Sequence, residues 1–242
     1  MNFVVVLEGK KFTSLEELGL NMYLYTEASE KLITSDKFLK FLKDYDNEKY
    51  SKLVKLNHSV RNYEEFIFLA QYIFNPTMNL RHHTYSFQTF QELGEKILNY
   101  APQIDVYLMD FLKYKLLSKY MEMTNYHLRD QDLYQKIKEI EKVYDINTKK
   151  AYFFLGFTLA NCDIIYYDGK IYHDVDELFK ELTSEYHLAK YASLIDANQY
   201  LLSYLSFYGY NNIVDRYQSL TNLIATLEDE YENRRKNSKM EK

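Results

Sequence analysis

Two stretches of the chain are apolar on nearly every side of a helical projection, which predicts helices buried among other elements. Residues 66–74 read FIFLAQYIF and residues 152–160 read YFFLGFTLA, and an asparagine follows each of them. Two other stretches, residues 128–144 and 213–231, interleave charged with apolar positions at helical spacing. That pattern is typical of helices that cover the outside of a fold. The chain is therefore predicted to be mainly helical.

Short apolar runs broken by two-residue turns predict small β-hairpins. Residues 3–12 read FVVVLEGKKF and residues 164–172 read IIYYDGKIY. In both, a glycine stands at the second turn position, where it adopts a positive φ without strain. A third such segment lies between these two in the sequence. There His83 and Thr84 take the places of Asp168 and Gly169.

These turns begin three segments that align with one another, residues 8–19, 83–94 and 168–179. In each segment an aromatic residue, an N-cap residue, an apolar residue, a glutamate and a leucine recur in register. The N-cap residues are Ser14, Thr89 and Asp174, and the glutamates are Glu17, Glu92 and Glu177. A glutamate three residues after the N-cap forms a capping box, so this array is interpreted as structural rather than catalytic.

The recurrence predicts a fold that is mainly α with small β-hairpins, arranged as tandem helix–hairpin–helix repeats of about 85 residues. We expect three units. Residues 1–63 form a truncated first unit, and residues 64–148 form the second. Residues 149–242 form the third unit together with a C-terminal helix.

Composition narrows the class of protein further. Only six glycines and two prolines occur in 242 residues, which favours long helices over a barrel or a sandwich. One cysteine, Cys162, excludes an internal disulfide framework and a cysteine-rich zinc site. Apolar runs are far shorter than the roughly 20 residues that cross a bilayer, and no signal peptide precedes them. We expect a soluble cytoplasmic protein without a membrane partner.

Thirty basic residues stand against thirty-five acidic ones, which gives a net charge of −5. The two signs are interspersed, whereas a nonspecific nucleic-acid binder needs a basic surface. A nucleic-acid partner is therefore not expected.

The most unusual candidate site is the turn Arg81-His82-His83, where a hairpin has lost the residues that favour its turn. Neighbouring strand residues point to opposite faces, so the two imidazoles are not expected to share a metal ion. We interpret the segment as a solvated variant turn. Phosphate-binding loops and HExxH or GxSxG motifs are absent from the sequence. No catalytic residue, metal site or cofactor is therefore assigned.

Aromatic residues make up 17% of the chain, with 26 tyrosines, 15 phenylalanines and no tryptophan. Tyrosine is enriched at protein–protein interfaces because it joins a large contact area to a polar tip. We expect most of these rings in the core and a minority on an interaction surface. Together with the histidine turn, the candidate interaction residues are Arg81, His82, His83, Tyr166, Tyr167, Tyr208 and Tyr210.

The sequence between Glu64 and Tyr217 resembles a known kind of module. The motifs that carry the resemblance are AYFFLG at residues 151–156, YDGKIY at residues 167–172 and YLLSYLSFYGY at residues 200–210. The segment is similar to repeat modules that accompany chaperone-type ATPases and eukaryotic-like Ser/Thr kinases in Firmicutes. No kinase or ATPase signature is present here, so the resemblance implies an accessory recognition module and no catalytic residue.

These observations favour a non-enzymatic protein-interaction module, an adaptor or a phage-type inhibitor of a host protein. The alternative is an enzyme or effector that acts on a nucleotide or nucleic acid through Arg81, His82 and His83. A homo-oligomeric scaffold is a third reading. A pocket that gathers the histidines with a carboxylate would favour the enzyme, and a solvent-facing turn would favour the binding module.

Overall fold

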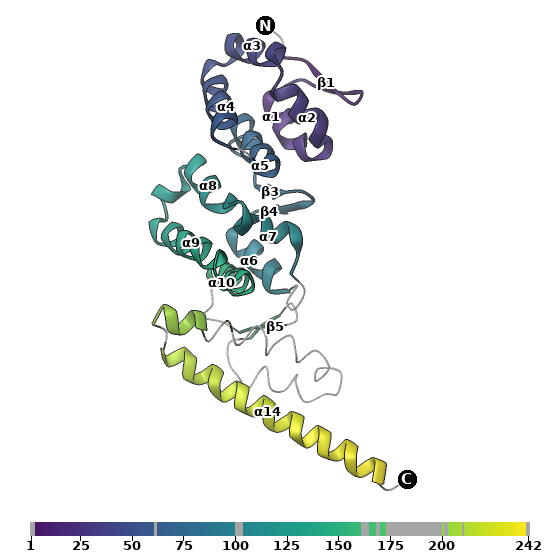
Figure 1. Cartoon of the computed structure of the whole chain (residues 1–242), viewed down its shortest axis with the longest axis vertical. Helices are drawn as coiled ribbons and strands as arrows, with labels where there is room; N and C mark the ends of the chain where they lie inside the picture. The colour runs from purple at the N-terminus through teal and green to yellow at the C-terminus, as the bar shows by residue number, and fades with distance from the viewer. Residues whose placement is uncertain are drawn as a thin grey trace. The chain divides into compact units, whose positions relative to one another are not determined.

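The computed structural model describes residues 3–60, 62–99, 104–160, 165–167, 170–172, 200, 203–209 and 211–240. The protein is mainly helical and carries small antiparallel hairpins, which confirms the predicted fold class at that level (Figure 1). It divides into two compact units. Unit 1 comprises Met1–Thr89 and Val106–Lys142, and unit 2 comprises Phe90–Asp105 and Val143–Lys242.

Unit 1 opens with the predicted N-terminal hairpin. Strands β1 (Val5–Leu7) and β2 (Lys10–Phe12) pair antiparallel, with Leu7 opposite Lys10. Glu8 and Gly9 both have positive φ, 45° and 84°, as a two-residue turn of this kind requires. Leu7 and Phe12 bury their side chains beneath the hairpin.

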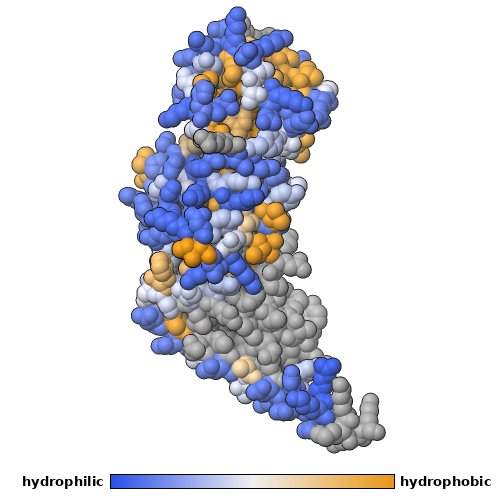
Figure 2. All heavy atoms as spheres, in the orientation of Figure 1, coloured by the Kyte–Doolittle hydropathy of each residue, from blue (hydrophilic) through white to orange (hydrophobic). Residues whose placement is uncertain are grey.

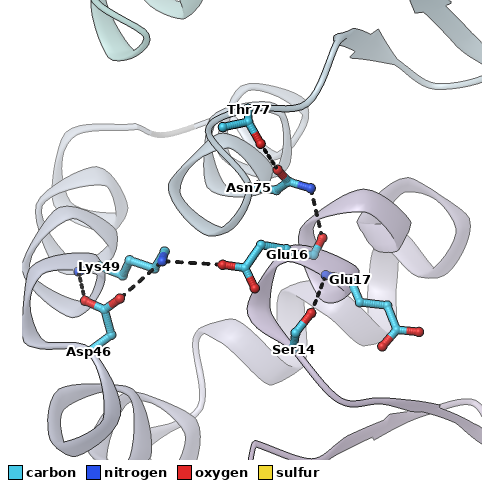
Figure 3. Close-up of polar contacts among 7 residues, drawn as sticks. All are labelled: Ser14, Glu16, Glu17, Asp46, Lys49, Asn75 and Thr77. Atoms are coloured by element: carbon cyan, nitrogen blue, oxygen red, sulfur yellow. Dashed lines mark hydrogen bonds and ion pairs between the residues drawn. The ribbon is translucent and has the colours of Figure 1, made fainter.

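The helix after this hairpin is capped as the sequence predicts. The Ser14 hydroxyl accepts from the Glu17 amide at 3.0 Å (Figure 3). The Glu17 carboxylate in turn accepts from the Thr13 amide at 2.9 Å. Five helical segments follow before the central helix: α1 (Leu15–Asn21), the 3₁₀ segment η1 (Met22–Tyr25), α2 (Thr26–Ile33), α3 (Asp36–Tyr45) and α4 (Asn47–Ser59).

Helix α5 (Tyr63–Phe74) is the predicted central helix of unit 1, and every residue from Phe66 to Phe74 is buried. Helix α1 packs against it at Gly19, where a Cβ atom would lie 2.8 Å from the carbonyl oxygen of Gln71. Just past the helix end, the Asn75 amide donates to the Glu16 carbonyl at 3.2 Å (Figure 3). The absence of a side chain at Gly19 therefore sets how closely the two helices approach.

A second hairpin follows α5. Strands β3 (Leu80–His82) and β4 (Tyr85–Phe87) pair with His82 opposite Tyr85. Unit 1 continues with α7 (Val106–Lys113), α8 (Leu116–Met123), the 3₁₀ segment η2 (Tyr126–Leu128) and α9 (Gln131–Tyr144) up to Lys142. Helix α9 buries Ile137, Ile140 and Glu141 and exposes much of its remaining surface, as expected of an outer helix.

Unit 2 is built on the pair α6 (Phe90–Asn99) and α10 (Thr148–Ala160). A Cβ atom on Gly94 would lie 2.3 Å from the Ala160 backbone nitrogen. The predicted burial of α10 is confirmed, since nearly all of its residues from Ala151 onward are buried. Unit 2 also contains β5 (Ile165–Tyr167), β6 (Lys170–Tyr172), a helical turn at residues 203–207 and α14 (Asn211–Met240).

Several sequence predictions lie outside the described residues, namely those for Asp168, Gly169, Asp174, Glu177 and Cys162. Helix α14 covers the predicted outer helix at residues 213–231, and almost all of its described side chains are exposed. Within the described part of the chain, no helix has the length and apolar character needed to cross a membrane.

Candidate functional site

The sequence predicts a solvated turn at the second hairpin, and this holds for the exposed Thr84 but not for the buried His82. His82 is the last residue of β3 and its side chain is 0% exposed. His83 has a φ of 49°, so it lies in the left-handed region and leaves the strand. The alternation of faces therefore fails at this point, and both imidazole rings pack against the ring of Tyr23, at 5.4 and 4.9 Å.

His82 is held from both of its nitrogens. Its Nδ1 lies 2.8 Å from the Tyr23 hydroxyl, and its Nε2 lies 3.1 Å from Oδ2 of Asp110. Burial, with a smaller contribution from the charge of Glu64, raises the pKa of Tyr23 far above its ordinary value. The tyrosine therefore keeps its proton and is able to donate it to Nδ1. In the tautomer that accepts this hydrogen bond, the ring proton of His82 lies on Nε2 and faces Asp110.

His83 lies at the edge of the same cluster. Its Nε2 is 3.1 Å from Oε2 of Glu64, and its ring packs 4.3 Å from that of the half-exposed Tyr107. Burial and the neighbouring His82 lower the pKa of His83, while Glu64 acts in the opposite direction. The neutral imidazole, which can ligate a metal ion, is therefore favoured.

One donor atom each from His82, His83 and Asp110 lies within 4.8 Å of the others. Sequence reasoning missed the carboxylates and the tyrosine, because they come from other elements: Glu64 from α5, Asp110 from α7 and Tyr23 from η1. One signal was present. Asp110 is the single charged residue in the apolar run from Leu108 to Leu112, and it is buried with 6% exposure.

Arg81 forms its hydrogen bonds with other residues of unit 1 and not with the histidines. Its guanidinium donates to the carbonyl of Leu20 at 3.1 Å, and its backbone amide donates to the Tyr72 hydroxyl at 2.8 Å. Among the three residues of the candidate turn, the structure thus brings the two histidines together and directs Arg81 to neighbouring backbone.

The tyrosines proposed as interaction residues are only partly described. The side chains of Tyr166 and Tyr167, and the whole of Tyr210, lie outside the described residues. Tyr208 is half-buried, and its ring packs 4.9 Å from that of the buried Tyr204. Figure 2 shows hydrophobic side chains as separate patches among hydrophilic ones on the face in view. Exposed apolar residues scattered in this way do not by themselves define a site.

A larger feature of unit 1 is a cleft of about 750 Å³ between α4, α5 and α8. Its apolar lining includes Leu56, Leu69 and Ile73. Around these residues lie acidic and basic side chains in equal number: Asp46, Glu48, Glu65, Glu122, Lys49, Lys52, Lys55 and Lys119. None of these charged residues was singled out from the sequence, because their charges follow the ordinary pattern of solvated helix faces.

Most of the lysines that line the cleft are paired with carboxylates. Lys49 lies 3.2 Å from Asp46 and 3.8 Å from Glu16, and Figure 3 shows these contacts. Lys52 pairs with Glu48 at 2.6 Å, and Lys119 contacts Glu65. The lining is therefore electrically balanced, which differs from the unpaired basic groups that bind phosphates.

Comparison with models of known protein families gives no match, and searches of curated proteins and of solved structures also find no similar protein.

Proposed function

We propose that the chain is a non-enzymatic protein-binding module and that it holds a segment of its partner in the cleft between α4, α5 and α8. The observation that carries this proposal is the lining of the cleft, in which an apolar base is bordered by paired charges. Interfaces between proteins combine an apolar centre with a polar rim in the same way. The balanced charge favours a protein over a nucleic acid as the partner.

A tandem arrangement of hairpin–helix units supports this role. We infer the repeat from two equivalent packing sites. Gly19 lies five residues into α1, and Gly94 lies five residues into α6; each helix follows a hairpin directly. Each glycine lets its helix approach the end of a long apolar helix, α5 or α10. Repeats that pack in this way create extended surfaces that commonly serve binding.

In this view the repeat begins at the hairpin. The repeat boundaries expected from the sequence, at residues 63 and 148, then fall at the start of α5 and of α10, and each of these helices ends one hairpin–helix repeat. The resemblance to modules that accompany bacterial kinases and ATPases stays a prediction. It agrees with the proposed role as an adaptor or as an inhibitor of a host protein.

Affinity capture from a lysate of the organism that encodes the chain tests the proposal, with two variants of helix α4. Ser59 lines the cleft, whereas Ser51, an exposed residue about two helix turns earlier on α4, is not among the residues that line it. Both hydroxyls donate to backbone carbonyls of α4. A Ser59→Trp substitution fills the cleft, and Ser51→Trp is the matched control. Capture is performed in about 0.3 M salt, where the screening length falls to about 6 Å.

We expect the wild type and Ser51→Trp to retain the same partner, and Ser59→Trp to lose it. Equal capture by all three proteins would refute the cleft as the binding surface. Recovery of nucleic acid or a small molecule alone would refute the protein-binding function.

The alternative function, action on a nucleotide through the histidine turn, is favoured by one observation. His82 and His83 lie together with the carboxylates of Asp110 and Glu64. Arg81, the residue best suited to a phosphate, is bound to the Leu20 carbonyl instead. The histidine cluster therefore supports metal binding more directly than it supports phosphate binding.

A further inference from the structure

We propose that His82, His83 and Asp110 form a binding site for a divalent transition-metal ion of the Zn²⁺ type. Two imidazoles and one carboxylate are a donor set that suits such ions and leaves a position open for water or another ligand. The three donor atoms already lie within 4.8 Å of one another. This inference is independent of the cleft and of the partner proposed for it.

The distance between two of the donors fits a shared ion. Nε2 of His82 and Oδ2 of Asp110 are 3.1 Å apart. Two atoms at this separation, each about 2.05 Å from one ion, subtend an angle of about 100° at the ion, close to the tetrahedral value. The His83 donor lies within 4.8 Å of both atoms, so it must approach them to complete a three-ligand set.

Both imidazoles also have the supporting contacts that metal ligands normally show. A ligating histidine commonly has its other nitrogen held by a carboxylate, a carbonyl or a similar group, which fixes the ring orientation. Here Tyr23 holds Nδ1 of His82, and Glu64 lies 3.1 Å from Nε2 of His83. On the His82 ring, the nitrogen left for the ion is Nε2, which faces Asp110.

The charges of the cluster favour a cation. Asp110 is a nearly buried carboxylate whose described hydrogen-bond partner is Nε2 of His82. Burying a carboxylate without a full countercharge is costly. A divalent ion bound to Nε2 of His82 and to Asp110 would supply that countercharge. Nε2 must then carry no proton, so in the metal-bound form the ring proton lies on Nδ1, which donates it to the Tyr23 oxygen. Proton and metal therefore compete for one position, and the hydrogen-bonded triad is the metal-free form of the site.

The full chain is first stripped of metal with a chelator and then titrated with Co²⁺, because the visible absorption of Co²⁺ reports its ligands. The bound Co²⁺ is then displaced with Zn²⁺. Two variants remove donors. Asp110→Asn keeps an oxygen that accepts from Nε2 of His82, so it preserves the hydrogen bond while weakening metal binding. His83→Gln changes a side chain at the edge of the cluster. His58→Gln, at an exposed position on α4, is the matched control.

We expect the wild type and His58→Gln to bind one equivalent of Co²⁺ and to release it to Zn²⁺. Loss of a supporting partner alone costs 10- to 100-fold in metal affinity, so loss of a ligand in Asp110→Asn or His83→Gln should cost about 100-fold or more. Absence of saturable binding by the wild type would overturn the proposal and leave a hydrogen-bonded core histidine. Equal affinity in all four proteins would overturn it as well.

Discussion

Substitution of Gly94 by alanine tests how closely α6 and α10 approach in unit 2. The new Cβ would lie 2.3 Å from the Ala160 nitrogen, 2.7 Å from the Leu159 carbonyl carbon and 2.8 Å from the Gly156 oxygen. Ordinary van der Waals contacts begin at about 3.4 Å, so the two helices must separate by about 1 Å to accept the new Cβ. A gap of this size loses a quarter to a half of the dispersion energy of each contact between them.

All three of these neighbours are backbone atoms, so no side-chain rotation relieves the clash. We therefore take the upper end of the overpacking range, about 3 kcal/mol. Alanine gains about 1 kcal/mol over glycine in a helix interior. The expected net loss is about 2 kcal/mol in the free energy of unfolding, measured by urea denaturation and far-UV circular dichroism.

The control for this substitution is Gln91→Ala, at an exposed position of the same helix, which loses only a side-chain hydrogen bond to Glu95. We expect it to change stability by less than about 0.5 kcal/mol. Gly19→Ala should fall between the two, because its closest contact is longer, at 2.8 Å. A Gly94→Ala protein as stable as the wild type would show that α6 and α10 do not cross at this glycine.

Three further substitutions probe separate features of the fold. Ser14→Ala removes the N-cap of α1 and should cost about 1 kcal/mol in thermal or urea unfolding; a neutral result would contradict the cap. Tyr23→Phe leaves Nδ1 of the buried His82 without its donor, and should cost about 1–3 kcal/mol, whereas an unchanged midpoint would argue against this hydrogen bond. Burial raises the pKa of the Glu141 carboxyl in the folded state. At pH values between its ordinary pKa and this raised pKa, the folded state binds more protons than the unfolded state, so the free energy of unfolding falls as pH rises. Glu141→Gln should therefore flatten this decline in a pH series of urea titrations, and an unaltered slope would refute the assignment.

Features set by neighbouring residues could be predicted from the sequence. The turn of the first hairpin follows from the positive φ that glycine tolerates at position 9, and the cap of α1 follows from Ser14 and Glu17 alone. The burial of α5 and α10 follows from helices that lack a polar face. In each case the residues that decide the structure lie within one or two turns of one another.

The cleft could not be predicted, because it depends on how three helices diverge. The residues that line it are distributed over α4, α5 and α8, and each helix alone presents an ordinary mixture of charged and apolar positions. The pairing of Lys119 with Glu65 joins residues 54 positions apart. Only the packing of α8 against α5 places these two side chains together.

The histidine cluster shows where a local rule misleads. Alternation along a strand would separate His82 and His83, yet that rule ends where the strand ends, and the positive φ of His83 keeps both rings beside Tyr23. A non-glycine residue with positive φ is uncommon and needs support from its surroundings. The contacts of His83 with Tyr107 and Glu64 supply that support, and they also hold its ring near His82 and Asp110. The same contacts thus account for the conformation of the turn and for the arrangement of donors that makes it a candidate metal site.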